Sequence, residues 1–139
     1  MKKSNIPFKS NGLKCALCGK DLSETLSGNV VFVKECDAQG LSTDKIVDVM
    51  LVSKECDSAL QEACRKEHLS TTYWNELVYY KNPIIWWQHL NDFIEELTKG
   101  NYTSKAAEKM KALLWETYPF IARDLSESEE QMGRTIISI

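Results

Sequence analysis

The pattern of apolar and polar positions divides the chain into a β-prone N-terminal part and a helical C-terminal part. Residues 29–33 form a short β-branched run, and residues 46–52 form a second apolar run that only Asp48 interrupts. The segment 37–40 between them contains Asp and Gly, which favour turns. We therefore predict an antiparallel hairpin built from these two runs.

From residue 57 onward the apolar residues recur at helical spacing. Ser58 and Gln61 have the spacing of a capping box, which predicts that a first helix begins there. Residues 70–72 offer three hydroxyl side chains that can cap a second helix. That second helix is expected to carry Tyr73, Trp74, Leu77, Val78 and Tyr80.

The clearest helical stripe comes after Asn82 and Pro83, a strong N-cap and a residue suited to the first helical position. Its apolar positions are Trp86, Leu90, Phe93, Ile94 and Leu97, and Lys99-Gly100 closes it. A further helix begins near residue 103. Pro119 is expected to end or kink that helix, with residues 120–125 helical beyond it.

The elements together predict an α+β fold, in which a small N-terminal zinc-knuckle β-hairpin unit packs on a C-terminal bundle of four to five helices. The 139 residues suit a single domain, 1–139. Within it we expect a cysteine-knuckle β subregion at 1–56, a helical subregion at 57–134 and a β-prone tail at 135–139.

Composition and charge indicate an ordinary globular protein. Hydrophobic residues make up 43% of the chain and charged residues 27%, with a net charge of −3. No apolar stretch is long enough to span a membrane and no secretory signal is visible, so we expect a cytoplasmic protein. Five lysines precede Asp21, the first acidic residue, which gives the N-terminal lobe a basic character.

The strongest chemical signal is the cysteine pair in Cys15-Ala-Leu-Cys18-Gly19. A two-residue spacer lets both thiolates reach one ion, and the glycine permits the tight turn after them. This motif resembles the knuckle of zinc ribbons and treble clefs, and the resemblance implies a structural Zn²⁺ with four ligands.

The remaining ligands are less clear from the sequence. A second knuckle fits best at 53–56, where Ser53 stands in place of a first cysteine, so we predict the set Cys15, Cys18, Cys56 and Cys36. In a simple hairpin, however, Cys36 and Cys56 lie at opposite ends of the unit. Alternatives for the fourth ligand are Cys64 and His68, which share one helical face.

No catalytic constellation is visible in the sequence. There is no Gly-rich phosphate loop, Gly-x-Ser-x-Gly motif or His-Glu-x-x-His motif. The polar residues His89, Asp92, Glu95 and Glu96 flank the apolar stripe of their helix, so they are expected to form its solvated face.

Adjacent aromatic residues suggest a binding surface. Neighbouring helical positions are about 100° apart, so Trp86 and Trp87 cannot both face inward. We predict that Trp87, Tyr79 and Tyr80 bind a protein partner.

Three functional classes are compatible with these features. The preferred class is a non-enzymatic regulatory or interaction protein with a structural zinc site, of the small accessory kind that mobile elements or phages encode. The alternatives are a zinc-ribbon nucleic-acid-binding protein and a thiol-redox protein that uses Cys15 and Cys18. The net negative charge and the presence of only three arginines argue against nucleic acid.

Overall fold

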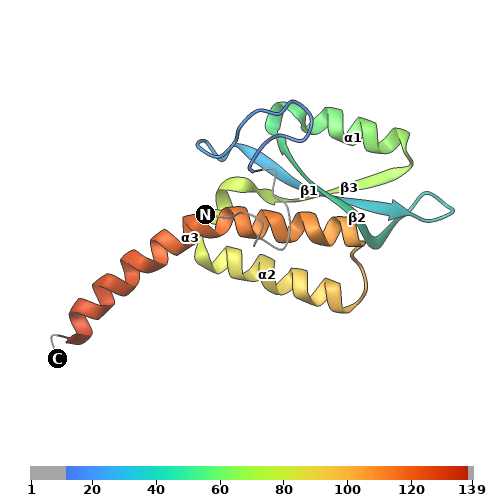
Figure 1. The fold of residues 1–139 in the computed structure, drawn as a ribbon. Helices are drawn as coiled ribbons and strands as arrows, with labels where there is room; N and C mark the ends of the chain where they lie inside the picture. The colour runs from blue at the N-terminus through green and yellow to red at the C-terminus, as the bar shows by residue number, and fades with distance from the viewer. Residues whose placement is uncertain (1–11, 138–139) are drawn as a thin grey trace, which may run out of the picture.

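A three-stranded antiparallel sheet forms the centre of the molecule in the computed structural model (Figure 1). The structure describes residues 12–137, and its description of side chains leaves out Tyr73, Trp74 and residues 123–137. The strands are β1 (Gly28–Cys36), β2 (Ser42–Ser53) and β3 (Leu69–Glu76), in the order β2-β1-β3.

The predicted hairpin is confirmed. Strand β1 pairs with β2 in antiparallel register, with Gly28 opposite Ser53 and Cys36 opposite Ser42. Strand β1 is buried along most of its length because it lies between two strands and is covered on both faces. The two ends of β1 lie at opposite ends of the sheet, which separates Cys36 from the cysteines near Ser53.

The second predicted helix is wrong, because its predicted caps and first residues, 70–76, form part of strand β3. Thr71 and Thr72 are β-branched, and the two aromatic residues after them also favour strands. The free edge of β1 supplies the hydrogen-bonding partner, pairing Phe32 with Thr72. Only residues 77–81 turn helically, as the short 3-10 segment η3 (Leu77–Lys81).

The predicted bundle of four to five helices is also wrong, since the described residues contain three α-helices. These are α1 (Asp57–Lys66), α2 (Pro83–Thr98) and α3 (Ser104–Ile137), with the 3-10 segment η2 (Lys54–Cys56) before α1. Figure 1 shows α1 on one face of the sheet and the pair α2 and α3 on the other. The sheet separates the helices, so each face of the sheet has its own core.

Helix α2 begins as the sequence predicts. The side-chain oxygen of Asn82 accepts hydrogen bonds from the backbone N–H of Ile84 at 2.9 Å and of Ile85 at 3.3 Å, with Pro83 at the first helical position. Gly100, at φ +76°, takes the left-handed conformation that ends a helix without steric cost. By contrast, α1 begins at Asp57 without a side-chain cap, so the predicted capping box at Ser58 does not form.

Helix α3 continues through Pro119, so the proline does not end it, and residues 120–125 are helical as predicted; Figure 1 shows that the axis of α3 changes direction along its length. A proline costs the helix the hydrogen bond to the carbonyl four residues earlier, here that of Trp115. Trp115 and Pro119 lie on an exposed face, so water can solvate the released carbonyl. Residues 135–137 of the predicted β-prone tail belong to α3, whereas residues 138–139 lie outside the described residues.

His89 lies in the core and not on the solvated face that the sequence predicts. Its ring is 5% exposed and stacks on Tyr80, with ring centroids 4.4 Å apart. The Tyr80 hydroxyl and the side-chain amide of Asn75 each lie 3.3 Å from one of its ring nitrogens. Strand β3 and segment η3 bring these partners to α2, which the helical pattern alone could not indicate.

Acid is expected to destabilise the protein through this histidine. Burial lowers the pKa of His89 from 6.5 to about 4. Between these values the unfolded chain binds a proton that the folded chain does not, so stability is complete above pH 6.5 and falls as the pH drops towards 4. The expected loss is up to about 3 kcal/mol. Urea unfolding at pH 7.0, 5.5 and 4.5 measures it, and a His89→Gln protein that shows an equal loss would contradict the assignment.

Candidate metal centre

Three cysteine thiols converge at the end of the sheet where β1 begins and β2 ends. The Sγ atoms of Cys15, Cys18 and Cys56 all lie within 4.8 Å of one another. Cys15 and Cys18 belong to the loop that precedes β1, while Cys56 is the last residue of η2, immediately before α1. In a tetrahedral zinc site with Zn–S bonds of about 2.3 Å, sulfur atoms lie about 3.8 Å apart, so a small closing movement brings these thiols to one ion.

The loop around Cys15 is shaped by backbone hydrogen bonds. The N–H of Cys15 donates to the carbonyl of Lys20 at 2.9 Å, and that of Gly19 donates to the carbonyl of Cys15 at 2.9 Å. Gly19 has φ +76°, a left-handed conformation that favours glycine. The turn also directs the N–H of Cys18 at the Cys15 sulfur, 3.5 Å away. Amide donors of this kind stabilise a thiolate.

Contacts with the hairpin hold the loop in place. The N–H of Ala16 donates to the carbonyl of Leu51 at 2.8 Å, which joins the loop to β2. Leu22 is fully buried, and its Cδ1 would lie 2.9 Å from a Cβ atom at Gly28. Glycine at this position therefore lets the loop pack directly on β1. The thiols are brought together by packing across a large sequence separation.

Ser53 lies at the centre of the thiol cluster. It is fully buried at the end of β2, and its Oγ is 3.9 Å from the Sγ of Cys18. Its side chain also acts to lower the pKa of the Cys15 and Cys56 thiols, so it lies close to both. Ser53 and Cys56 have the same spacing as Cys15 and Cys18. The segments 15–18 and 53–56 together bring three thiols and one hydroxyl to this site.

The environment favours a thiolate at Cys15. Burial alone would raise its pKa, but N–H groups of Cys18, Ser53 and Leu17 and the Ser53 side chain lower the pKa to about 6. At Cys56 the Ser53 hydrogen bond lowers the pKa, but hydrogen bonds to Cys15 and Cys18, burial and the Cys15 charge together raise it. The negative charge on one sulfur thus opposes ionisation of its neighbour, and a bound cation would remove that opposition.

Three other residues considered from the sequence lie away from this cluster. Cys36 is at the opposite end of β1 and lines a surface hollow together with His68. Cys64 is buried on α1 beside the sheet core, and burial raises its pKa. The structure thus brings together Cys15, Cys18 and Cys56 and does not bring Cys36 to them, because antiparallel pairing separates the two ends of β1. Among the described residues no other His, Cys, Asp or Glu joins the group.

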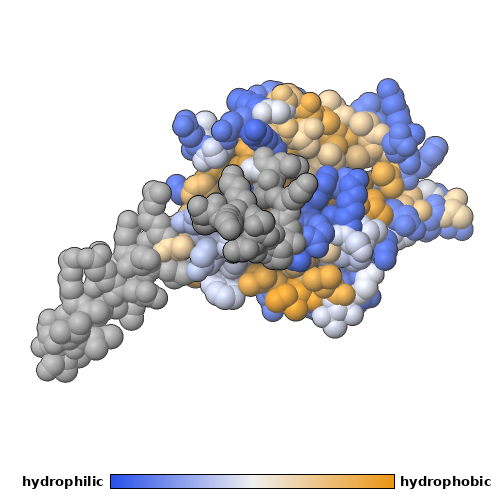
Figure 2. Space-filling view, viewed as in Figure 1, coloured by the Kyte–Doolittle hydropathy of each residue, from blue (hydrophilic) through white to orange (hydrophobic). Residues whose placement is uncertain are grey.

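The aromatic residues predicted to bind a partner fall into two groups. Tyr80 is fully buried against His89 and is therefore not available at the surface, because η3 turns it into the core. Tyr79 and Trp87 are exposed, by 47% and 56%. Figure 2 shows an apolar area over α2. Among the side chains that the structure describes, the large apolar ones exposed on α2 and α3 are Ile84, Trp87, Ile94, Leu97, Trp115 and Tyr118.

The fold and the site together define an α+β protein with a cysteine cluster that can bind a metal ion at the junction of a loop, a hairpin and a helix. Comparison of the chain with family models, curated proteins and solved structures finds no match. None of the three helices, as far as the structure describes them, is long and apolar enough to cross a membrane.

Proposed function

We propose that this chain is a non-enzymatic protein that binds one structural Zn²⁺ and interacts with a protein partner through the outer face of α2 and α3. The proposal rests on the convergence of Cys15, Cys18 and Cys56 at the start of α1. Three soft thiolates favour zinc over hard cations such as Mg²⁺ or Ca²⁺. An ion there would join the N-terminal loop, the β-hairpin and α1 at one point.

Ser53 or a water molecule completes the tetrahedron in this proposal. The Ser53 hydroxyl lies 3.9 Å from the Cys18 sulfur and acts to lower the pKa of the Cys15 and Cys56 thiols, so its side chain lies near the position of a fourth ligand. Cys15 and Ser53 are buried, which shields two sides of the site from solvent. Three thiolate ligands at the junction of a loop, a hairpin and a helix suit a structural metal better than a catalytic one.

Replacing Ser53 by Cys is expected to convert this cluster into a four-thiolate site. Zinc affinity should rise at least tenfold, because a thiolate is a stronger zinc ligand than a neutral hydroxyl. Competition with a chromophoric chelator measures the affinity, and elemental analysis should give one zinc per chain in both proteins.

Ser104→Cys supplies the matched control, since Ser104 is an exposed serine at the start of α3. It should leave the zinc affinity unchanged. If the parent protein and the Ser53→Cys protein both fail to retain zinc when refolded with it under reducing conditions, the metal assignment is wrong.

The partner surface in this proposal is the groove between α2 and α3. A shallow hollow there is lined by Leu90, Trp86, Trp115 and Tyr118, with Lys111 at its margin. Trp115 and Tyr118 are exposed at this hollow, and exposed apolar side chains that lie together mark interaction sites in soluble proteins. Two helices present parallel ridges with a groove between them, a shape that accepts the apolar face of a third helix. We therefore propose an amphipathic helix of a partner protein as the occupant.

The two alternative functions receive less support from the geometry. In a thiol-redox pair the attacking sulfur must be accessible. Here the sulfur with the lowered pKa belongs to Cys15, which is 3% exposed, while Cys18 is the exposed one. For nucleic acid, the basic lobe within the described residues contains Lys14 and Lys20, and Lys20 pairs with Glu55 at 3.2 Å. Lys2, Lys3 and Lys9 lie outside the described residues.

A further inference from the structure

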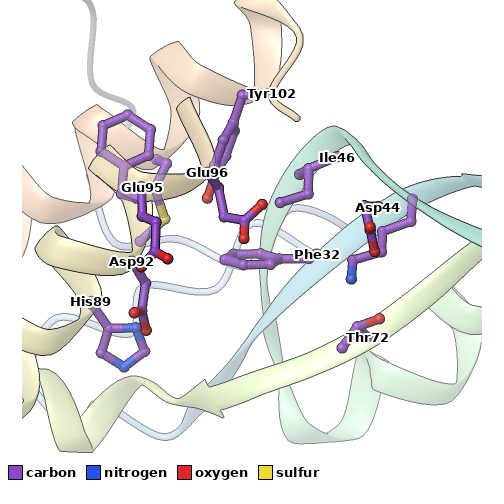
Figure 3. A pocket seen from close by; sticks show the side chains of 12 residues that line it. Phe32, Asp44, Ile46, Thr72, His89, Asp92, Glu95, Glu96 and Tyr102 are labelled. Atoms are coloured by element: carbon purple, nitrogen blue, oxygen red, sulfur yellow. The ribbon is translucent and has the colours of Figure 1, made fainter. Parts of the chain in front are cut away.

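A cavity of about 240 Å³ lies between the sheet and helix α2, on the side of the molecule that faces away from α1. Residues from all three strands contribute to its wall, together with α2 and the start of α3. Figure 3 shows Phe32 in the wall of the cavity, between the acidic side chains of α2 and Asp44 of β2, and the residue is 6% exposed. The cavity is separate from the cysteine cluster, and the proposed function does not use it.

Carboxylates surround the aromatic part of the cavity wall. Asp92, Glu95 and Glu96 line one side of the cavity from α2, with the carboxylate of Glu96 nearest to Phe32, and Asp44 lies on the opposite side, on β2 (Figure 3). Two ammonium groups partly balance these four acids. Lys34 lines the cavity, and Lys99 lies 3.6 Å from both Glu95 and Glu96. The cavity therefore retains a negative charge.

Asp92 is the carboxylate best placed to receive a cation. Among the described residues it has neither an ion pair nor a hydrogen bond, whereas Glu96 accepts a hydrogen bond from Asn101 at 2.6 Å. Burial and the charges of Glu95 and Glu96 raise the pKa of Asp92. Its carboxylate is thus held in a negative environment without a compensating group, and a cation bound there would be favoured.

Tyr102 adds a buried polar group to the same cavity. It is 9% exposed, and its ring makes edge contacts with Phe93 and Phe32, with centroids 5.0 and 6.3 Å apart. Its hydroxyl is accessible in the cavity, and no residue that the structure describes hydrogen bonds with it. Burial and the charges of Glu96 and Asp92 raise its pKa, so the hydroxyl stays protonated. A hydroxyl that is accessible in a cavity can hydrogen bond with a ligand that enters it.

The wide spacing of the carboxylates in this cavity favours an organic cation over a metal ion as its ligand. Within the described residues, only the three cysteines form a group of potential metal ligands whose atoms all lie within 4.8 Å of one another. The carboxylates here are spread around an aromatic ring instead. Aromatic faces attract organic cations and provide a surface for a hydrocarbon stem. The volume is below the range of about 300–1,000 Å³ usual for drug-sized ligands, so the ligand is small.

We propose that this cavity binds an aliphatic ammonium ion, with its carbon chain against Phe32 and Phe93 and its charged end held by Asp92, within reach of the Tyr102 hydroxyl. The same chemistry occurs in a free diamine and in the end of a lysine side chain. The two sources differ at the far end of the carbon chain. A diamine ends there in a second ammonium group, whereas a lysine side chain leaves the cavity and joins a peptide.

Binding can be measured by NMR titration of the ¹⁵N-labelled protein with 1,4-diaminobutane. Saturable shifts are expected at the backbone amides of Phe32, Thr72 and Tyr102. 1-Butanol and sodium chloride at matched ionic strength should leave these signals in place. Nα-acetyl-lysine methylamide forms the second arm: tighter binding than the diamine assigns the cavity to a lysine side chain, and weaker binding assigns it to a free amine.

Asp92→Asn should weaken diamine binding at least tenfold, and Tyr102→Phe about threefold. Asp92→Asn removes a negative charge that the neighbouring Glu95 and Glu96 repel, so the fold should tolerate the substitution. Unshifted signals elsewhere in the spectrum of the variant verify that it is folded. Glu62→Gln, on the exposed face of α1, is the matched control and should bind like the parent protein. Equal binding by the Asp92→Asn and parent proteins, or equal shifts with sodium chloride, would overturn the proposal.

Discussion

A Cys15→Ser protein is expected to melt about 10–15 °C below the parent protein when both are refolded with zinc. Cys15 is the most buried of the three clustered thiols, and its sulfur accepts the N–H of Cys18. A ligand present at about a thousand times its Kd stabilises a fold by about 4 kcal/mol, and a variant that cannot bind it loses this contribution. Calorimetry of both proteins, with and without a zinc chelator, measures the effect.

A comparison with the Cys36→Ser protein distinguishes the effect of losing the metal from the effect of losing a thiol group. Cys36 lies at the far end of β1 and is half-buried, so its replacement should change the melting temperature by no more than a few degrees. The chelator should destabilise the Cys36→Ser protein and the parent protein equally, and should leave the Cys15→Ser protein unaffected. Equal melting temperatures for the two serine variants, with no effect of the chelator, would exclude a structural metal.

The second large effect concerns the adjacent residues Trp86 and Trp87. Trp86→Ala is expected to cost about 4 kcal/mol of stability, because truncation of a core tryptophan leaves a cavity. Trp86 is 7% exposed, and its indole N–H donates to the Thr117 hydroxyl at 3.0 Å and lies 3.3 Å from the carbonyl of Leu114. Trp87→Ala should cost less than about 1 kcal/mol, since Trp87 is 56% exposed. Urea unfolding of both variants provides the comparison, and equal losses would place Trp87 in the core.

Cross-linking from position 87 can identify the proposed partner. A photo-cross-linking amino acid at position 87 should yield one cross-linked species in the native host, and the species should disappear when Trp115 is replaced by Ala. The same amino acid at position 62 on α1 is the control and should not yield it. A cross-link between two copies of this chain would indicate self-association in place of a partner helix.

The proposed zinc site has a structural consequence for the whole fold. The N-terminal loop contributes two thiols, the end of β2 contributes Ser53, and η2 contributes Cys56 just before α1. Around this point the loop is held by the Ala16–Leu51 hydrogen bond and by the ion pair of Lys20 with Glu55. A single ion would therefore fix the position of α1 on its face of the sheet. The acid-lined cavity lies on the other face, so ligands at the two sites are expected to bind independently.

The sequence by itself determined the features that arise from near neighbours along the chain. The Cys15–Cys18 turn, the hairpin of β1 and β2, and the start of α2 at Asn82 and Pro83 all result from local spacing and turn chemistry. Cys56 was also predicted as a ligand, because residues 53–56 have the spacing of a second knuckle, and the structure brings it to Cys15 and Cys18.

Only the tertiary structure decided which distant residues meet. A segment of threonines and aromatic residues became strand β3 because β1 has a free edge, and this pairing brought Thr72 to Phe32 and Asn75 to His89. The antiparallel register carried Cys36 away from the other thiols and left Ser53 beside them. Hydrophobic periodicity reports which side of an element is buried and not what it is buried against, so the thiol cluster and the acidic cavity emerge only from packing.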